Sequence, residues 1–239
     1  MDRTAMQSLN TQLIFVGEFN PAIVTPDWLA QKELINADDL AVCRDSLQAH
    51  GRSRLMAFES NWFRAQIVAN QLSIASLDGA TPRVADLAAG ILTLLPETPV
   101  SAFGINFDAH VKVLSVSDYH KIGDYFAPKE PFLEAIPSIG SEKTSAGLVH
   151  LTIALDTRPR DRMADAAGVS MQKRITIEPS NVVSPGIFFL YNHHVVVSSL
   201  PKTAPSDAVA TVEYMRVNWD SDMHEATEIF KSLLKRALT

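Results

Sequence analysis

Residues 100–114 read VSAFGINFDAHVKVL and show the most regular hydrophobic alternation in the chain. From residue 105 onward every second side chain is apolar, and the polar side chains between them belong to Asn106, Asp108, His110 and Lys112. Successive side chains of a strand point to opposite faces of a sheet. The stretch therefore predicts a long strand with one buried face and one polar face.

Shorter apolar runs, rich in β-branched and aromatic residues, lie on both sides of this stretch. They cover residues 13–19, 55–60, 62–69, 72–77, 148–155, 173–178 and 187–197. Polar pairs such as Ser60-Asn61 and Asn70-Gln71 separate neighbouring runs, which predicts tight turns and antiparallel pairing.

Capping signals indicate where helices begin. Thr25-Pro26 and Thr81-Pro82 each combine an N-cap residue with proline at the first helical position, and Asn36 precedes a further helical stretch. A last helix is predicted over residues 220–238. Its apolar stripe consists of Met223, Ala226, Phe230, Leu233, Leu234 and Ala237.

These elements predict an α+β protein with a largely antiparallel sheet, flanking amphipathic helices and a long C-terminal helix. Strands followed by a helix occur twice, in residues 55–95 and 148–238. We therefore expect a single globular unit over residues 1–239, with two similar α+β halves, 1–126 and 145–239, as a possibility. Residues 127–144, which contain three prolines, would connect the halves.

Composition narrows the partners and the compartment. Hydrophobic residues make up 46% of the 239 residues and charged residues 20%, which is ordinary for a globular protein. The net charge of −6 gives no general attraction to nucleic acid or to anionic membranes, so neither is expected as a partner. A single cysteine, no N-terminal apolar run and no apolar stretch of roughly 18 residues predict a cytoplasmic protein.

The familiar catalytic and nucleotide-binding motifs are missing from the sequence. It contains no G-x-G-x-x-G, G-x-x-x-x-G-K-[ST], G-x-S-x-G or H-E-x-x-H, and no pair of C-x-x-C motifs. No reaction, cofactor or metal is therefore predicted from a motif.

Two polar groups on predicted strands are candidate binding residues. Asn106, Asp108 and His110 share one strand face, and an aspartate beside a histidine can orient an imidazole as a base or a metal ligand. Asn192-His193-His194 interrupts an apolar strand, with Asn192 and His194 on one face and His193 on the other. The alternative interpretations are a solvated strand face for the first group and a histidine pair at an edge or subunit contact for the second.

If these two strands are neighbours, Asp108, His110 and His194 would form a set able to hold a transition metal. That arrangement would make the protein a metal-assisted enzyme. The idea depends on the register between the strands.

Three further groups have simpler explanations. Asp220, Asp222 and Glu225 are acids that the dipole of a helix start would favour. Cys43 falls on an apolar helix stripe and is expected in the core. Arg158, Arg160 and Arg162 lie in a polar loop and would either grip an anion or be solvated.

Three classes of function follow. The first is a non-catalytic binding or assembly protein, favoured because no catalytic signature is present. The second is a small-ligand binder with an apolar pocket between the sheet and the C-terminal helix, and the third is the metal-assisted enzyme. We also expect a homodimer, because short strands in an open sheet leave an edge that proteins cover or pair.

Overall fold

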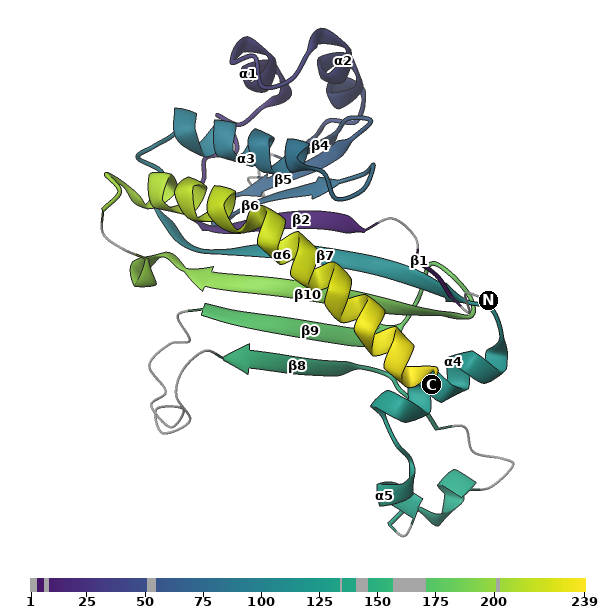
Figure 1. Ribbon diagram of the computed structural model, residues 1–239. Coiled ribbons are helices and arrows are strands. Elements are labelled where there is room, and N and C mark those ends of the chain that lie inside the picture. The colour runs from purple at the N-terminus through teal and green to yellow at the C-terminus, as the bar shows by residue number, and fades with distance from the viewer. Residues whose placement is uncertain are drawn as a thin grey trace.

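The computed structural model describes residues 4–6, 9–50, 55–133, 135–140, 146–156, 171–200 and 203–239. Its strands form one sheet, and two helices, α3 and α6, lie across the same face of it (Figure 1). The class of fold is therefore α+β, as predicted from the hydrophobic pattern.

All described strand pairs are antiparallel, in the order β3-β4-β5-β6-β2-β7-β10-β9-β8, with β1 also paired to β7. The strands are β1 (Thr4–Met6), β2 (Asn10–Gly17), β3 (Gln48–His50), β4 (Leu55–Glu59), β5 (Phe63–Val68), β6 (Gln71–Ser76), β7 (Val100–Val113), β8 (Leu151–Asp156), β9 (Met171–Pro179) and β10 (Gly186–Val196). Each predicted strand is present, with ends shifted by a few residues.

Strand β7 lies at the centre of the sheet, between β2 and β10. Its apolar side chains from Ile105 to Val113 are buried, and Asp108, His110 and Lys112 on the opposite face are half-buried or exposed. Strict alternation is the pattern of a strand that packs on one face only, so the prediction for this stretch is confirmed.

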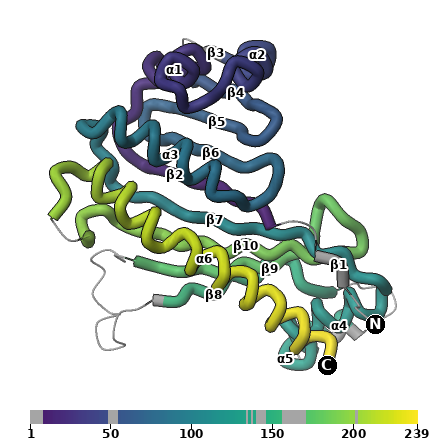
Figure 2. Tube along the Cα trace, turned by 45° about the horizontal axis from the view of Figure 1, so that its top comes forward, coloured from purple at the N-terminus to yellow at the C-terminus, as the bar shows by residue number. Residues whose placement is uncertain are grey.

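The two parts of the chain on either side of β7 follow the same order of elements. Strands β4, β5 and β6 lead inward to α3, and β8, β9 and β10 lead inward to α6. Figure 2 shows the two helices side by side on the sheet. One continuous sheet passes through both parts.

The shorter helices begin where the sequence indicates. Thr25 Oγ1 accepts a hydrogen bond from the Trp28 amide at 3.2 Å, and Asn36 Oδ1 accepts one from Asp39 at 2.7 Å, which satisfies amides that the first helical turn leaves free. The helices are α1 (Pro26–Gln31), α2 (Ala37–Asp45), α3 (Pro82–Leu94), α4 (Val116–Phe126), α5 (Glu130–Leu133) and α6 (Asp207–Ala237), with 3₁₀ turns η1 (Pro137–Gly140) and η3 (Val197–Ser199).

The prediction of the last helix was wrong about its start. Helix α6 has 31 residues and begins at Asp207, where Ser206 Oγ caps the amide of Val209. Its buried stripe therefore extends toward the N-terminus through Trp219, Met215 and Val212. None of the helices in the described ranges combines the length and the apolar character needed to cross a membrane.

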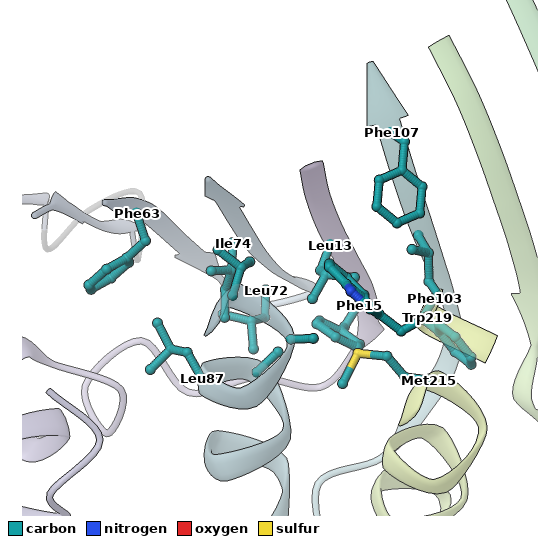
Figure 3. Packing of buried hydrophobic residues seen from close by; sticks show 14 of the residues in the cluster. Leu13, Phe15, Phe63, Leu72, Ile74, Leu87, Phe103, Phe107, Met215 and Trp219 are labelled. Carbon is teal, nitrogen blue, oxygen red and sulfur yellow. The ribbon is translucent and has the colours of Figure 1, made fainter. Parts of the chain in front are cut away.

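The core lies between the sheet and these two helices. Figure 3 shows side chains of β5, β6, β2 and β7 pointing toward Leu87 of α3 and toward Met215 and Trp219 of α6. Aromatic pairs span the two layers, with ring centroids 5.2 Å apart for Phe107 and Trp219 and 5.2 Å apart for Phe189 and Phe230. Edge-on and tilted contacts of this kind add to the stability that burial alone provides.

Phe230→Ala should lower the free energy of unfolding by about 3–5 kcal/mol, because the ring is fully buried and its removal leaves a cavity against Phe189. Urea unfolding measures this change. Val217→Ala, on the same helix at a residue that is 80% exposed, is the matched control and should change stability little. Equal effects of the two substitutions would show that α6 does not pack as described.

Candidate functional site

The six candidate binding residues fall on two faces of the sheet. Phe107 packs on Trp219 of α6, so Asn106, Asp108 and His110 lie on the other face of β7, and Asn192 and His194 on the adjacent β10 share that face. His193 points to the opposite face, toward α6. The five residues share the helix-free face, and His193 belongs to a separate polar group.

Side chains on the helix-free face bond to one another and to the backbone. Asn192 Nδ2 donates to Asn106 Oδ1 at 2.7 Å, and Asn106 Nδ2 donates to the carbonyl of Gln12 at 3.0 Å. Asp108 accepts from Asn10 Nδ2 at 3.2 Å. The polar atoms of this face are thus engaged across β2, β7 and β10.

The register does not assemble the metal-binding set that was one hypothesis for Asp108, His110 and His194. Across β10, Asp108 lies opposite Leu190, and His194 lies opposite Gly104, four residues further along β7. That offset separates the carboxylate from His194 by roughly 13 Å along the strands. Within the described ranges, no group of three or more His, Cys, Asp or Glu side chains is placed to hold a metal ion.

His110 also has a different neighbour from the one expected. Its Nδ1 lies 2.9 Å from Ser180 Oγ, and its ring packs against Phe188 with centroids 4.8 Å apart. The metal hypothesis is therefore corrected: β7 and β10 are neighbours, but alternation alone does not fix their register.

Burial alters two titratable groups on this face. Burial raises the pKa of Asp108 above its ordinary value, against smaller opposing effects of the hydrogen bond from Asn10 and the charge of His110. Burial, with the charges of Arg174 and His193 adding to it, lowers the pKa of His194. Both groups are thus biased toward their neutral forms.

The second polar group is buried between β10 and α6. His193 Nδ1 lies 2.7 Å from Asp222 Oδ2, and Asp222 is only 1% exposed. A carboxylate only accepts hydrogen bonds, so the histidine Nδ1 carries the proton in this contact. His193 Nε2 lies 3.3 Å from the hydroxyl of Tyr214, which also belongs to α6.

Three more side chains complete this group. The Tyr191 hydroxyl lies 3.1 Å from both Asp222 Oδ1 and Glu225 Oε2, and Lys173 of β9 forms an ion pair with Glu225. Lys173 Nζ is also 3.8 Å from Asp222. We call Lys173, Tyr191, His193, Tyr214, Asp222 and Glu225 the His193 cluster.

Local geometry explains why these residues meet. Tyr191 and His193 are two residues apart on β10 and share a face, and Lys173 is the register neighbour of His193 on β9. Asp222 and Glu225 are three residues apart on α6, so both face the sheet. Burial and the nearby carboxylates raise the pKa of Tyr191, which keeps its hydroxyl protonated as a donor.

The interpretation of Asp222 as a helix-capping acid is thereby corrected. Since α6 begins at Asp207, Asp222 lies in the middle of the helix, where the dipole of the helix start has no effect. It stands instead on the buried stripe and binds His193. The sequence contains the signal, because Asp222 follows Met215 and Trp219 at helical spacing and precedes Ala226.

The His193 cluster is a set of contacts that joins β9 and β10 to α6. Three hollows in the described surface, with volumes of about 290, 620 and 430 Å³, are lined by other residues. They lie beside Tyr119 and Ile187, beside Ser46 and Arg64, and beside Phe19 and Leu94. None of these three hollows borders the His193 cluster.

Two candidate groups remain. Cys43 is buried, and burial, assisted by the charge of Asp39, raises the pKa of its thiol to about 11, so the nucleophilic thiolate is disfavoured. Arg158, Arg160 and Arg162 lie outside the described residues.

Comparison with known protein families and with curated proteins gave no match to this chain.

Asp222→Asn should lower the free energy of unfolding by about 3–5 kcal/mol. The new amide N–H would face the donors of Tyr191 and His193, and the buried pair of His193 with Asp222 would be broken. Chemical denaturation measures the loss. Asp220→Asn is the matched control, since Asp220 is exposed on the same helix. A small loss for Asp222→Asn, equal to that of the control, would contradict the structural role of the pair.

Asp108→Asn should stabilise the protein at neutral pH and not at pH 3. The raised pKa means that the folded state keeps the carboxyl proton to a higher pH than the unfolded state. The stability tied to that proton is complete below about pH 3.9 and is lost as the pH rises through the folded-state pKa. The difference in melting temperature, variant minus parent, should therefore grow from pH 3 to pH 7; a constant or shrinking difference would refute the prediction.

Proposed function

We propose that the protein is a non-catalytic assembly protein that acts in the cytosol as a homodimer. The observation that carries this proposal is a difference between the outer strands at the two borders of the sheet. One border ends on a strand of three residues, and the other presents apolar side chains to solvent.

The first border ends on β3, which has three residues. Strand β3 pairs with β4, and Ser46 at the end of α2 bonds to β4 as well. Ser46 Oγ accepts from the Glu59 amide at 2.9 Å and donates to the Glu59 carbonyl at 2.8 Å. These bonds occupy the backbone of Glu59 on β4, and an outer strand as short as β3 offers few backbone groups to a further strand.

The opposite border is β8, whose one neighbour among the described strands is β9. Ile153 is 44% exposed and Leu155 is 43% exposed, although both belong to a strand. Exposed apolar side chains on an edge strand favour pairing with another strand, and an identical copy is the simplest source of one.

The packing favours assembly over the two other classes of function. The ring centroids of Phe103 and Tyr214 are 5.7 Å apart. With the pairs Phe107–Trp219 and Phe189–Phe230, these rings pack between the sheet and α6, where a small-ligand pocket would have to lie. The enzyme alternative required Asp108, His110 and His194 to meet, and the register places His194 away from the other two. A binding role for the polar residues on the helix-free face stays a prediction.

The cytosolic location is supported by the cysteine content. The sequence has one cysteine, so the chain forms no internal disulfide, and Cys43 is a buried free thiol. Proteins of oxidising compartments commonly rely on disulfides, which this chain does without.

Light scattering at tens of micromolar protein tests the proposal. A homodimer gives twice the chain mass of 26.2 kDa. Dilution should shift the mass toward the monomer with a single midpoint, because the two copies associate by mass action. A monomer mass throughout the concentration range would refute the proposal.

A further inference from the structure

We infer that Thr152 is an activated hydroxyl that accepts an acyl group from an ester with a good leaving group, with His150 as its base and Glu178 as the group that orients this base. The three side chains meet on the helix-free face of the sheet, at β8 and β9. The inference goes beyond the assembly role proposed above and does not depend on it. It requires one transfer per chain and no turnover.

Four side chains form a continuous chain of hydrogen bonds on this face. His150 Nδ1 lies 3.1 Å from Glu178 Oε2, and His150 Nε2 lies 2.8 Å from Thr152 Oγ1. Thr152 Oγ1 in turn lies 2.9 Å from Thr176 Oγ1. A carboxylate, an imidazole and a hydroxyl linked in this order are the arrangement that activates a hydroxyl nucleophile for acyl transfer.

The carboxylate sets the direction of each hydrogen bond in this chain. An ionised carboxylate only accepts hydrogen bonds, so His150 Nδ1 carries the proton, and Nε2 of the neutral ring presents its lone pair. Thr152 therefore donates its one hydroxyl proton to Nε2, and its oxygen accepts from Thr176. The proton that must leave Thr152 already lies on the side of the base that takes it.

The sheet explains why these residues meet. Thr152 of β8 is the register neighbour of Thr176 on β9, and Glu178 follows Thr176 by two residues, so these three side chains share one face. His150 directly precedes β8, and its two hydrogen bonds place its ring over the same face. Two of the three reacting groups thus stand on strands, which hold such distances better than loops do.

The group is open to solvent, in contrast to the buried pair of His193 with Asp222. The side chain of His150 is 57% exposed and that of Glu178 is 37% exposed, and Thr152 is exposed as well. Strand side chains stand perpendicular to the plane of the sheet. Strand pairing at the free border of β8 would therefore leave the Thr152 hydroxyl accessible.

The surroundings indicate the class of ester. On the same face of the sheet, Leu190 lies opposite Thr176 and Phe188 lies opposite Glu178, and both apolar side chains are half-buried. An apolar or aromatic part of an ester gains by contact with such side chains. Because these residues contribute base assistance to the reaction, the ester has to supply a good leaving group such as a phenolate.

The transfer step is balanced between the ester and these side chains. Thr152 Oγ1 forms a bond to the acyl carbon while its proton passes to His150 Nε2. The bond from the acyl carbon to the phenolate oxygen then breaks, and the phenolate takes the proton from Nε2. Glu178 keeps its hydrogen bond to Nδ1 and stabilises the imidazolium between the two steps, and the acyl group remains on Thr152 as an ester.

Acetylation of the full chain by p-nitrophenyl acetate tests the inference. Release of p-nitrophenolate gives the rate, and mass spectrometry of peptides gives the position of the acetyl group. We expect Thr152 to be acetylated much faster than Thr93, an exposed threonine of α3. Neutral hydroxylamine should remove this acetyl group, because it cleaves esters and leaves lysine amides intact.

Substitutions separate an activated hydroxyl from one that is merely exposed. His150→Ala should slow acetylation of Thr152 by about 100-fold, and Glu178→Gln by about 10-fold or more, because the base is lost or no longer oriented. Thr152→Ser should still be acetylated at this position. His120→Ala, which removes an exposed imidazole of α4, is the matched control and should leave the rate unchanged.

Three results would overturn the inference. The first is acetylation of Thr152 no faster than that of Thr93. The second is an equal rate at Thr152 in the parent, His150→Ala and Glu178→Gln, which would mean that the hydroxyl reacts without a base. The third is a loss in His120→Ala as large as that in His150→Ala.

Discussion

The contact between His193 and Asp222 determines how the largest helix lies on the sheet. It joins the centre of β10 to the middle of α6, and both side chains are almost fully buried. Removing either partner would leave the other with an unpaired polar group in the core, which is far less stable than the pair. Because a strand alternates its faces, a shift of one residue in β10 would turn His193 away from the helix, so the contact also fixes the register.

The rest of the molecule follows from this placement. With α6 held against β7 and β10, the aromatic side chains of both strands are covered. On the same face of the sheet, α3 covers β2 and β6 (Figure 2). The helix does not extend over β8, whose apolar side chains are left in solvent. The His193 cluster therefore serves the internal packing of α6. The strand β8, which α6 does not cover, is the part of the sheet that we propose for assembly.

Alternation and capping made most of the fold predictable from the sequence, because both are local properties of the chain. Residues 100–114 indicate β7, and Thr81-Pro82 indicates the start of α3. The register of β7 against β10 was not predictable, since it depends on contacts between distant residues, and the metal set assumed from Asp108 and His194 failed for that reason. The role of Asp222 was missed because the helix was expected to begin at residue 220, although the apolar spacing from Met215 to Ala226 already runs through it.

A double-mutant cycle between His193 and Asp222 tests the central claim most directly. Unfolding free energies are measured for the parent, His193→Ala, Asp222→Ala and the double variant. Our account predicts that the two substitutions are strongly non-additive, with the double variant close to the worse single variant and a coupling energy of about 2–3 kcal/mol. Additive effects, with a coupling energy near zero, would show that the pair does not hold α6 on the sheet and would contradict the account.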